Sequence, residues 1–289
     1  MEKAVALNKS KPTRKIVMDI IIYAILIAIS AVILIPLFWM ISTALKSNAD
    51  IFKWPPEWIP NPPHWENIAN AWNAMPFNKF LQNSLFIVVL GVTAEVISET
   101  IVAYGFARYD FPGKNIIFIL LLSTMMLPAH VTLIPTYIIW NKIGLIGEFD
   151  PLVLRAWTAW GPFYIFLMRQ FFMGIPKELD DAADIDGASL PRKFFQIMLP
   201  QIKPILAAIS VFAFRGYFNE FQGPLIYLSD KEKYTMTLGM YFFMGGVNEA
   251  PKWNYLMVIA LIIALPSIVL YFAAQKYFIE GITFTGLKD

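Results

Sequence analysis

Long runs of uncharged, mostly apolar residues are the feature that most limits what this 289-residue chain can fold into. A helix needs about 20 such residues to cross roughly 30 Å of hydrocarbon. Hydrophobic residues make up 57% of the chain and charged residues only 15%, whereas about one quarter of a soluble domain is charged. Helices also satisfy their own backbone hydrogen bonds, as a membrane interior requires. The sequence therefore predicts an all-α integral membrane protein.

Six runs are long enough to be membrane spans, and they predict six transmembrane helices in one domain covering residues 1–289. The first, third and last runs are nearly free of charged residues, whereas the second, fourth and fifth contain or adjoin acidic and basic ones. A charge at the bilayer centre costs at least about 2.5–3.5 kcal/mol, so these three helices should face protein or water. The runs cover about residues 16–44, 80–107, 115–141, 152–172, 204–228 and 253–275.

The distribution of Lys and Arg predicts the orientation. These residues are more numerous in the N-terminal tail (about 1–15) and in the segments on the same side of the membrane as this tail than in the segments on the opposite side. The side richer in Lys and Arg is the cytoplasmic one, so both termini are predicted to be cytoplasmic. On the other side, the loop at about 46–79 carries the stretch WPPEWIPNPPHWENIANAW (54–72), which contains five prolines and several tryptophans. This composition favours an extended segment at the membrane interface, followed by a short amphipathic helix near Trp65–Trp72.

The polar segment ELDDAADIDGASLPRKFFQIMLP (residues 178–200) lies on the cytoplasmic side between two apolar runs. Pro176 can occupy the first turn of a helix, and acidic residues follow it at the positive end of the helix dipole. Gly187 can end this helix in a left-handed conformation, and Ser189 can cap a second one. The pattern predicts a helix-turn-helix in which Ala182, Ala183 and Gly187 form a small-residue face for a docking protein. The alternative that the residues alone leave open is a solvated loop with one helical turn. The acidic residues are Glu178, Asp180, Asp181, Asp184 and Asp186.

The same segment carries a recognisable signature. From Asp181 it runs D-A-A, three residues, Gly187, nine residues, and Ile197-x-Leu199-Pro200. This spacing is similar to the EAA signature of the membrane subunits of bacterial ABC importers, with Asp181 in place of the leading Glu. Further stretches resemble carbohydrate-importer permeases related to the inner subunit of the maltose transporter. They are NSLFIVV (83–89), AYGFARYDFPGKN (103–115), MMLPAHVTLIPTY (125–137), FLMRQFFMGIPKEL (166–179), NEFQGPLIYL (219–228), YTMTLGM (234–240) and GITFTGLK (281–288).

This resemblance implies an ABC importer permease fold in the bacterial inner membrane, with a coupling loop at about 174–203 that fits a cleft on an ATPase subunit. It also implies a second related permease, two ATPase subunits that carry ATP and Mg, and a periplasmic or extracellular solute-binding protein contacting loops 46–79 and 229–252. The solute would be a sugar or oligosaccharide, and this chain itself would hold no cofactor. The residues matched for ATPase coupling are Glu178, Asp181, Ala182, Ala183, Gly187, Leu199 and Pro200.

Polar residues inside the predicted spans offer a candidate solute path. Arg215 lies near the position of a family aromatic, and an arginine can form paired hydrogen bonds with a sugar hydroxyl or a carboxylate. The alternative interpretation is a structural ion pair between Glu95 and Arg215 that joins the second and fifth spans. The candidate path residues are Glu95, Arg215, Tyr217, Asn219 and Glu220.

Two other classes of function are the alternatives, an ion-coupled transporter and an integral-membrane enzyme. An ion-coupled transporter could use Glu95 and Glu99, which lie on one helix face. An integral-membrane enzyme is disfavoured, because the chain has only His64 and His130 as histidines and lacks H-E-x-x-H, G-x-S-x-G and a phosphate-binding G-x-x-x-x-G-K-[ST] motif. No catalytic or metal-ligating residue is therefore predicted. The absence of Cys excludes disulfides, and the dispersed basic residues give no nucleic-acid surface.

Overall fold

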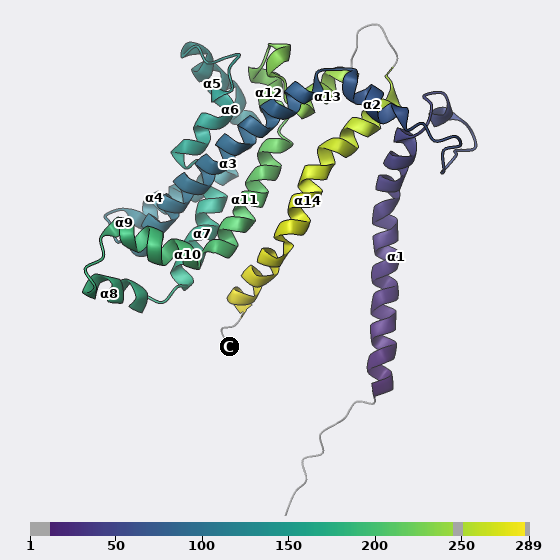
Figure 1. The fold of residues 1–289 in the computed structure, drawn as a ribbon. Coiled ribbons are helices and arrows are strands. Elements are labelled where there is room, and N and C mark those ends of the chain that lie inside the picture. Colours follow the sequence, from purple (N-terminus) through teal and green to yellow (C-terminus); the bar gives the residue numbers. More distant parts are fainter. Residues whose placement is uncertain (1–11, 245–250, 287–289) are drawn as a thin grey trace, which may run out of the picture. The chain divides into compact units, whose positions relative to one another are not determined.

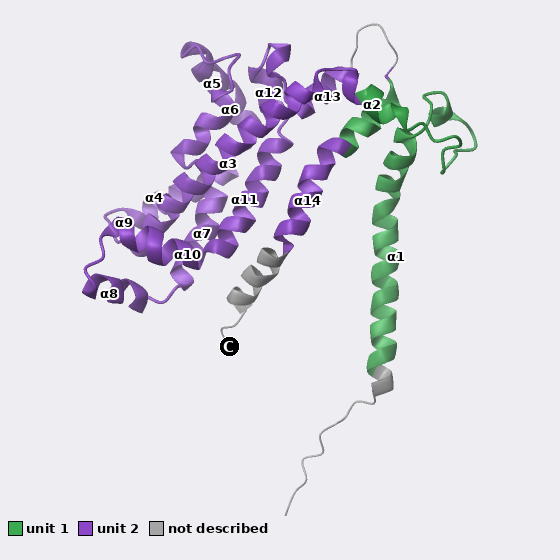
Figure 2. Ribbon diagram, viewed as in Figure 1, with its two compact units in different colours: residues 1–71, 252–261 green, residues 72–251, 262–289 purple. Residues whose placement is uncertain are grey.

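The structure is a computed structural model that describes residues 12–244 and 251–286, with side chains described for residues 15–244 and 251–275. Within these ranges every regular element is helical, which confirms the all-α prediction (Figure 1). The chain divides into two compact units, residues 1–71 with 252–261 and residues 72–251 with 262–289 (Figure 2). A single domain over residues 1–289 stays a prediction. Most of the predicted tail at 1–15 lies outside the described residues.

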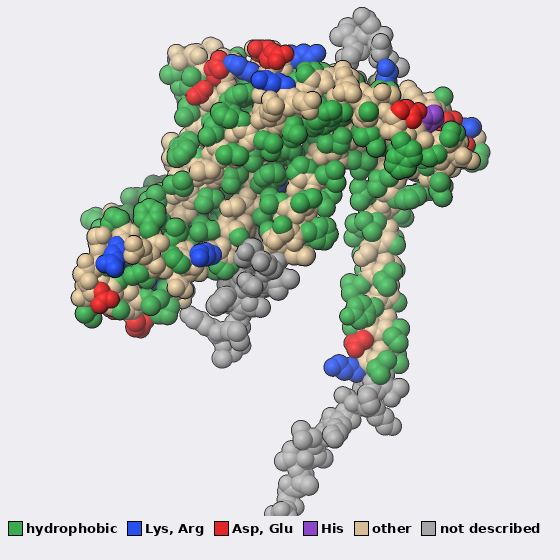
Figure 3. Space-filling view, in the orientation of Figure 1, with side chains coloured by type: hydrophobic (Ala, Val, Ile, Leu, Met, Phe, Trp, Pro, Cys, Tyr) green, Lys and Arg blue, Asp and Glu red, His purple; other side chains and the backbone are tan. Residues whose placement is uncertain are grey.

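The first unit is built around the end of one long helix. It contains α1 (Pro12–Ala44), η1 (Asp50–Phe52), most of α2 (Glu66–Asn73) and the start of α14 (Trp253–Gly286). The α2 helix confirms the short helix predicted near residues 65–72. The visible flank of α1 is covered largely by hydrophobic side chains (Figure 3).

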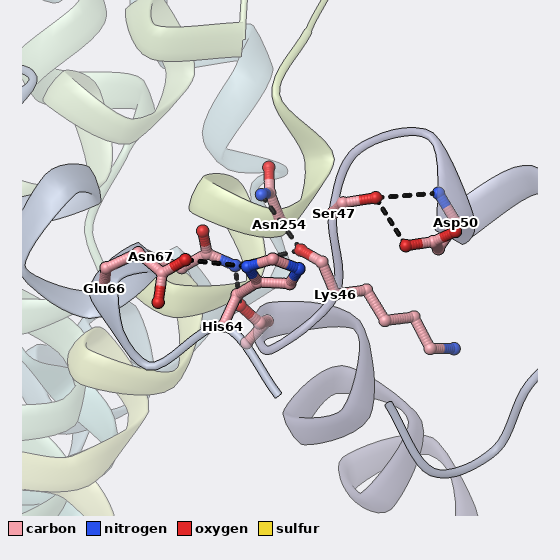
Figure 4. A network of polar contacts seen from close by, with 8 residues as sticks. Lys46, Ser47, Asp50, His64, Glu66, Asn67 and Asn254 are labelled. Atoms are coloured by element: carbon pink, nitrogen blue, oxygen red, sulfur yellow. Dashed lines mark hydrogen bonds and ion pairs between the residues drawn. The ribbon is translucent and has the colours of Figure 1, made fainter. Parts of the chain in front are cut away.

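Two asparagines hold the chain where α1 ends (Figure 4). The amide of Asn67 donates to the carbonyl oxygens of Ala44 and Lys46, each at 2.9 Å, and the amide of Asn254 donates to the Lys46 carbonyl at 3.1 Å. The last carbonyls of a helix lack partners within the helix, so the bond to Ala44 satisfies an acceptor that would otherwise need water, and the two bonds to Lys46 fix the turn that follows α1. The Lys46 ammonium lies 4.2 Å from the ring centroid of Trp39, and burial lowers the pKa of Lys46.

The second unit is a helical bundle around α3 (Phe77–Arg108), which packs against α7, α11, η3 and α13. Its main hydrophobic core joins α3, α4, α7, α11 and the segment before α11, and includes Ile165, Met168, Phe172, Met198 and Ile209. The remaining elements are α4 (Lys114–Ser123), η2 (Thr124–Met126), α5 (Ala129–Lys142), α6 (Asp150–Val153), η3 (Leu154–Thr158), α7 (Pro162–Gly174), α8 (Glu178–Ile185), α9 (Leu190–Arg192), the π-helical η4 (Lys193–Met198), α10 (Leu199–Gln201), α11 (Lys203–Phe218), α12 (Gln222–Tyr227), η5 (Lys231–Lys233) and α13 (Met236–Met244).

Three helices in the described part of the chain are long and apolar enough to span a membrane by themselves, at residues 15–44, 77–108 and 253–275. They correspond to the first, second and last predicted spans. The third run is instead a pair of helices bent by 101° near Pro128, and the fifth is part of a pair bent by 79° where α10 meets α11. Counting each bent pair as one span gives up to five.

The fourth predicted span, at about 152–172, is the reason that the count of six is not confirmed. It folds as the end of α6, the turn η3 and the 13-residue helix α7, separated at Ala159 to Gly161. Gly161 precedes Pro162, whose ring fixes the start of α7 and disfavours a helical conformation at the residue before it. A 13-residue helix is about 20 Å long, shorter than the roughly 30 Å hydrocarbon layer.

Candidate functional site

A cavity of about 670 Å³ opens within the second unit, between α3, α5, α7, α11 and the short elements η3 and α12. Three of the five residues predicted for a solute path line it, namely Glu95, Tyr217 and Glu220. Its other polar groups include the Arg155 guanidinium and several threonine hydroxyls. The aromatic residues that line it are Trp140, Trp160, Tyr164, Tyr217 and Tyr227.

Glu95 is held in this cavity by Tyr217. The Tyr217 hydroxyl donates to Glu95 Oε1 at 3.1 Å, joining α3 to α11. This approach requires Gly91, one turn before Glu95, because a Cβ at that position would lie 2.5 Å from the Tyr217 ring. The glycine is therefore explained by close packing of two helices around a polar contact.

Glu220 and Arg155 place charges elsewhere on the cavity wall. Glu220 follows α11, and its Oε1 accepts a hydrogen bond from the backbone N–H of Gly223 at 2.8 Å. Arg155 lies on η3, with its guanidinium carbon 5.6 Å from the ring centroid of Trp160. From the sequence, Arg155 was expected only as the flank of a predicted span. The signal in the sequence was the position of Arg155 within an apolar run, because a charged residue in a membrane-spanning segment usually faces protein or a polar cavity.

Arg215 and Asn219 belong to a different hollow, also of about 670 Å³, lined by parts of α7, α11 and α14 within the second unit. The Asn219 amide donates to the Arg215 carbonyl at 3.0 Å and lies 3.4 Å from the Ser267 hydroxyl. A helix turns about 100° per residue, so Arg215 and Tyr217 point to nearly opposite sides of α11. The predicted path residues are thus divided between two hollows.

The structure does not form the alternative Glu95–Arg215 ion pair. Tyr217 is the hydrogen-bond partner of Glu95, and among the residues whose side chains are described no carboxylate lies within ion-pair distance of Arg215. The neighbouring Glu99 is completely buried beside Gly161, and a Cβ at Gly161 would collide with its carboxylate. Neither carboxylate oxygen of Glu99 has a side-chain or backbone hydrogen-bond partner in the described part of the chain.

The coupling loop (residues 174–203) forms the polar helix-turn-helix expected from its sequence. Helix α8 is followed by Gly187 in the left-handed conformation, with φ of +69°, and then by α9, η4 and α10. Of the residues matched for coupling, Leu199 is half-buried and Ala183 is buried with 3% of its surface exposed. The exposed ones are Glu178, Asp181, Ala182, Gly187 and Pro200.

The expected place of Pro176 in the coupling loop was wrong, and the expectations for Ser189 and for the small-residue face hold only in part. Pro176 does not lie in the first turn of α8, because the helix begins at Glu178 with Lys177 as its N-cap residue. Ser189 is the N-cap residue of α9, but its side chain makes no capping hydrogen bond. Because Ala183 is buried, only Ala182 and Gly187 of the three predicted residues remain on the exposed small-residue surface.

An ion pair ties the two halves of the coupling loop together. The Lys193 ammonium lies 2.5 Å from Asp184 Oδ1 and connects η4 to α8. The hydrogen bond to Asp184 is the main cause that raises the pKa of Lys193. The Ala188 N–H also donates to the Ala183 carbonyl at 2.9 Å, across the turn at Gly187. The loop is therefore a folded knob with internal contacts.

Each of the two histidines contacts one of the polar side chains that the structure describes. His64 contacts Glu66 at 2.7 Å and His130 contacts Gln222 at 3.1 Å. No group of three or more His, Cys, Asp or Glu residues suited to a metal ion occurs in the described ranges.

Comparison with known sequences gives consistent matches over most of the chain. The family model described as "Binding-protein-dependent transport system inner membrane component" matches residues 99–283. The chain is 33% identical to the probable ABC transporter permease protein YurM of Bacillus subtilis, over 97% of this chain and 92% of that protein. It is 30% identical to the diacetylchitobiose uptake system permease protein NgcG of Streptomyces coelicolor, over 88% and 84%. It is 32% identical to the sn-glycerol-3-phosphate transport system permease protein UgpE of Yersinia pestis, over 92% and 96%.

Solved structures match the fold. A bacterial ABC transporter involved in the import of the acidic polysaccharide alginate superposes with a TM-score of 0.80 over 93% of this chain and 98% of that chain, at 22% identity. A bacterial alginate ABC transporter in complex with an alginate pentasaccharide-bound periplasmic protein gives a TM-score of 0.66 over 90% and 94%, at 14% identity. At these identities the likeness concerns the fold.

Proposed function

Because this chain belongs to the family of binding-protein-dependent transport system inner membrane components, we propose that it forms half of the translocation path of an ATP-driven sugar or oligosaccharide importer. The family makes it a transport permease rather than an enzyme, and a membrane protein. A second, related permease would supply the other half of the path. An external solute-binding protein would deliver the solute.

The coupling loop is the observation that carries the proposal. Asp181, Ala182 and Gly187 are exposed on a compact polar knob, in the same unit as the cavity. The small side chains allow another backbone to approach closely, and the acidic first turn of α8 complements a basic surface. We therefore assign the knob to the cleft of an ATPase subunit. Asp181 or Glu178 would pair there with a basic residue.

The ATPase must be a separate chain under this proposal. The sequence has no G-x-x-x-x-G-K-[ST] phosphate-binding loop, so ATP and Mg would be bound by the partner. One coupling loop engages one ATPase subunit, and two ATPases that close on each other require two permeases. Closure would draw the two coupling loops together and switch the spans between inward-facing and outward-facing states. The coupling loop and both termini would then be cytoplasmic.

The cavity suits a solute rich in hydroxyl groups. Carboxylate oxygens of Glu95 and Glu220 can accept hydrogen bonds from hydroxyls, and the Arg155 guanidinium can donate them. Aromatic side chains such as Trp140 and Trp160 present faces against which the apolar side of a sugar ring packs. We assign the solute path to this cavity. Arg215 and Asn219, in the other hollow, would face water or the second permease.

External contacts complete the proposal. The loop at 46–79 follows α1 and exposes several aromatic residues, among them Trp54 and Trp65. Together with loop 229–252, it would contact the solute-binding protein. Residues 245–250 of the second loop lie outside the described residues.

Purification of the tagged chain from its native membrane tests the proposed assembly. Native mass spectrometry should find one copy of this chain, one copy of a different permease and two copies of an ATPase subunit. Addition of the solute-binding protein in its loaded form should stimulate ATP hydrolysis by this complex. A stable homo-oligomer that transports sugar and hydrolyses ATP without other subunits would contradict the proposal.

A further inference from the structure

Arg108, the last residue of α3, contacts the coupling loop at three places. Its Nη2 donates to the carbonyl oxygen of Ile175 at 2.9 Å, just after α7. Its Nε lies 3.4 Å from Asp180 Oδ2 in the first turn of α8. Nη2 also lies 3.9 Å from the sulfur of Met198 at the end of η4. One guanidinium thus contacts the entrance, the first helix and the exit of the loop.

These contacts are sheltered from solvent. Only 6% of the Arg108 side chain and 19% of the Asp180 side chain are exposed. An ion pair this well buried is less screened by water than a surface pair. A lysine ammonium is a single point charge, so it would not reproduce a planar guanidinium whose Nη2 donates to the Ile175 carbonyl while its Nε lies beside Asp180 at ion-pair distance.

Neighbouring side chains fix the same end of α3 in the bundle. The Tyr104 ring packs against Phe172 of α7 and Phe194 of η4, with centroids 5.3 and 5.1 Å apart. Arg169 of α7 donates from Nε to the Phe106 carbonyl at 3.3 Å. A displacement of the coupling loop therefore acts directly on the end of α3.

Helix α3 also reaches the cavity. It is one continuous helix of 32 residues without an internal proline, and Glu95 lies on it. The 13 residues from Glu95 to Arg108 correspond to about 20 Å of helix. A continuous helix with packed neighbours can carry a displacement between two sites if it has two discrete positions.

We propose that Arg108 is a positioning residue that joins the coupling loop to α3, so that movement of the loop by the ATPase is passed along α3 to Glu95 in the cavity. The inference rests on the proposed function, because it assigns a route to coupling between the ATPase and the solute path. It assigns Arg108 and Asp180 a role that is separate from the exposed residues facing the ATPase.

The test uses the complete complex in proteoliposomes, with ATP hydrolysis and uptake of the labelled native solute, identified by binding to the solute-binding protein, measured in the same samples. Arg108→Gln should leave the subunits assembled and ATP hydrolysis stimulated, but should lower the solute taken up per ATP hydrolysed by at least about fivefold. Asp180→Asn should act in the same direction. Asp180→Glu, which keeps a carboxylate, should retain most of the coupling.

A double variant and a matched control separate coupling from general destabilisation. If the two residues act as a unit, Arg108→Gln with Asp180→Asn should be little worse than Arg108→Gln alone. Lys114→Gln is the control: it removes an ion pair with the fully exposed Asp110 carboxylate and should leave the amount of solute taken up per ATP hydrolysed unchanged. The residue would have only a structural role if Arg108→Gln lowered assembly but left the ratio within twofold of the wild-type value.

The wild-type measurement separates failure of the proposed function from failure of the proposed role of Arg108. A wild-type complex that takes up solute without ATP hydrolysis would contradict the proposed function, and the coupling route with it. A wild-type complex that couples normally, together with an Arg108→Gln variant that also couples normally, would overturn only the role of Arg108.

Discussion

At the scale of single residues, Gly91 makes the most specific prediction about the cavity. Gly91→Ala should lower the free energy of unfolding by about 1–3 kcal/mol, because the added methyl group overlaps the Tyr217 ring and overpacks the contact between α3 and α11. Solute uptake should also fall as the Tyr217 hydroxyl is displaced from Glu95. Denaturation of the purified complex and uptake in proteoliposomes measure the two effects.

Gly105 is the matched control on the same helix. A Cβ there meets no atom within 4 Å, so Gly105→Ala should stabilise α3 by about 0.5–1 kcal/mol through its better helix propensity. Equal stability of the two variants would contradict the packing of Tyr217 over Gly91.

The pair formed by Lys193 and Asp184 makes a prediction about pH. The hydrogen bond to Asp184 raises the pKa of Lys193 in the folded loop. Stabilisation from this shift is therefore fully present below the pKa of an unfolded lysine, about 10.4, and is lost as pH rises through the higher folded value. The difference in thermal stability between wild type and Lys193→Met should stay constant from about pH 6 to 9 and shrink above about pH 10. A difference that disappears between pH 6 and 8 would exclude this pair as its source.

At the scale of elements, the turn at Gly187 determines the shape of the coupling loop. A left-handed conformation costs a residue with a side chain roughly 1–2 kcal/mol, and asparagine tolerates it best. Nothing lies within 4 Å of a Cβ at this position, so the effect of a substitution comes from the backbone. We expect Gly187→Val to weaken ATPase binding and Gly187→Asn to retain most of it, as measured by co-purification.

Gly144 supplies the control for Gly187. It has a φ of +76°, equally free surroundings and a position outside the coupling loop, between α5 and α6. Gly144→Val should therefore cost similar stability without releasing the ATPase. Loss of the ATPase in both variants would mean that general destabilisation, rather than the shape of the loop, causes the effect.

The sequence predicted elements well where a local pattern determines them. Gly187 was correctly placed at a left-handed turn, and three long helices match predicted spans. The break at Gly161 within the fourth run was not predicted, because apolar composition shows that a segment is buried in lipid or protein but not whether it is one helix. Likewise, the inward turn of Ala183 depends on packing within the folded loop.

The candidate site was only partly predictable for a related reason. Sequence proximity grouped Arg215 with Tyr217, yet their positions on α11 place them in separate hollows. Glu95 and Tyr217 are 122 positions apart in the chain, so no local pattern could reveal their hydrogen bond. Gly91 is a signal of this kind of approach, since a glycine within a helix often marks close packing.

At the scale of the whole molecule, the exposed apolar surface raises the question of which neighbours cover it. Many large hydrophobic side chains on α1, α4 and α5 are exposed, for example Ile27, Leu120 and Ile134. Lipid and a second permease would both cover such surfaces. Composition cannot separate these two neighbours, because helix surfaces facing lipid and facing other helices are similarly apolar. The proposed partner arrangement therefore rests on the family and the coupling loop rather than on the hydrophobic pattern.

The most direct test of the central claim is uptake by the reconstituted complex of this chain, its partner permease and the ATPases. Proteoliposomes with ATP at the coupling-loop face should accumulate the labelled native solute only when the loaded solute-binding protein is present on the opposite face. Uptake should stop when ATP is replaced by a non-hydrolysable analogue and should continue when a protonophore collapses the proton gradient. Uptake that persists without ATP hydrolysis and stops with the protonophore would contradict the account and favour an ion-coupled transporter.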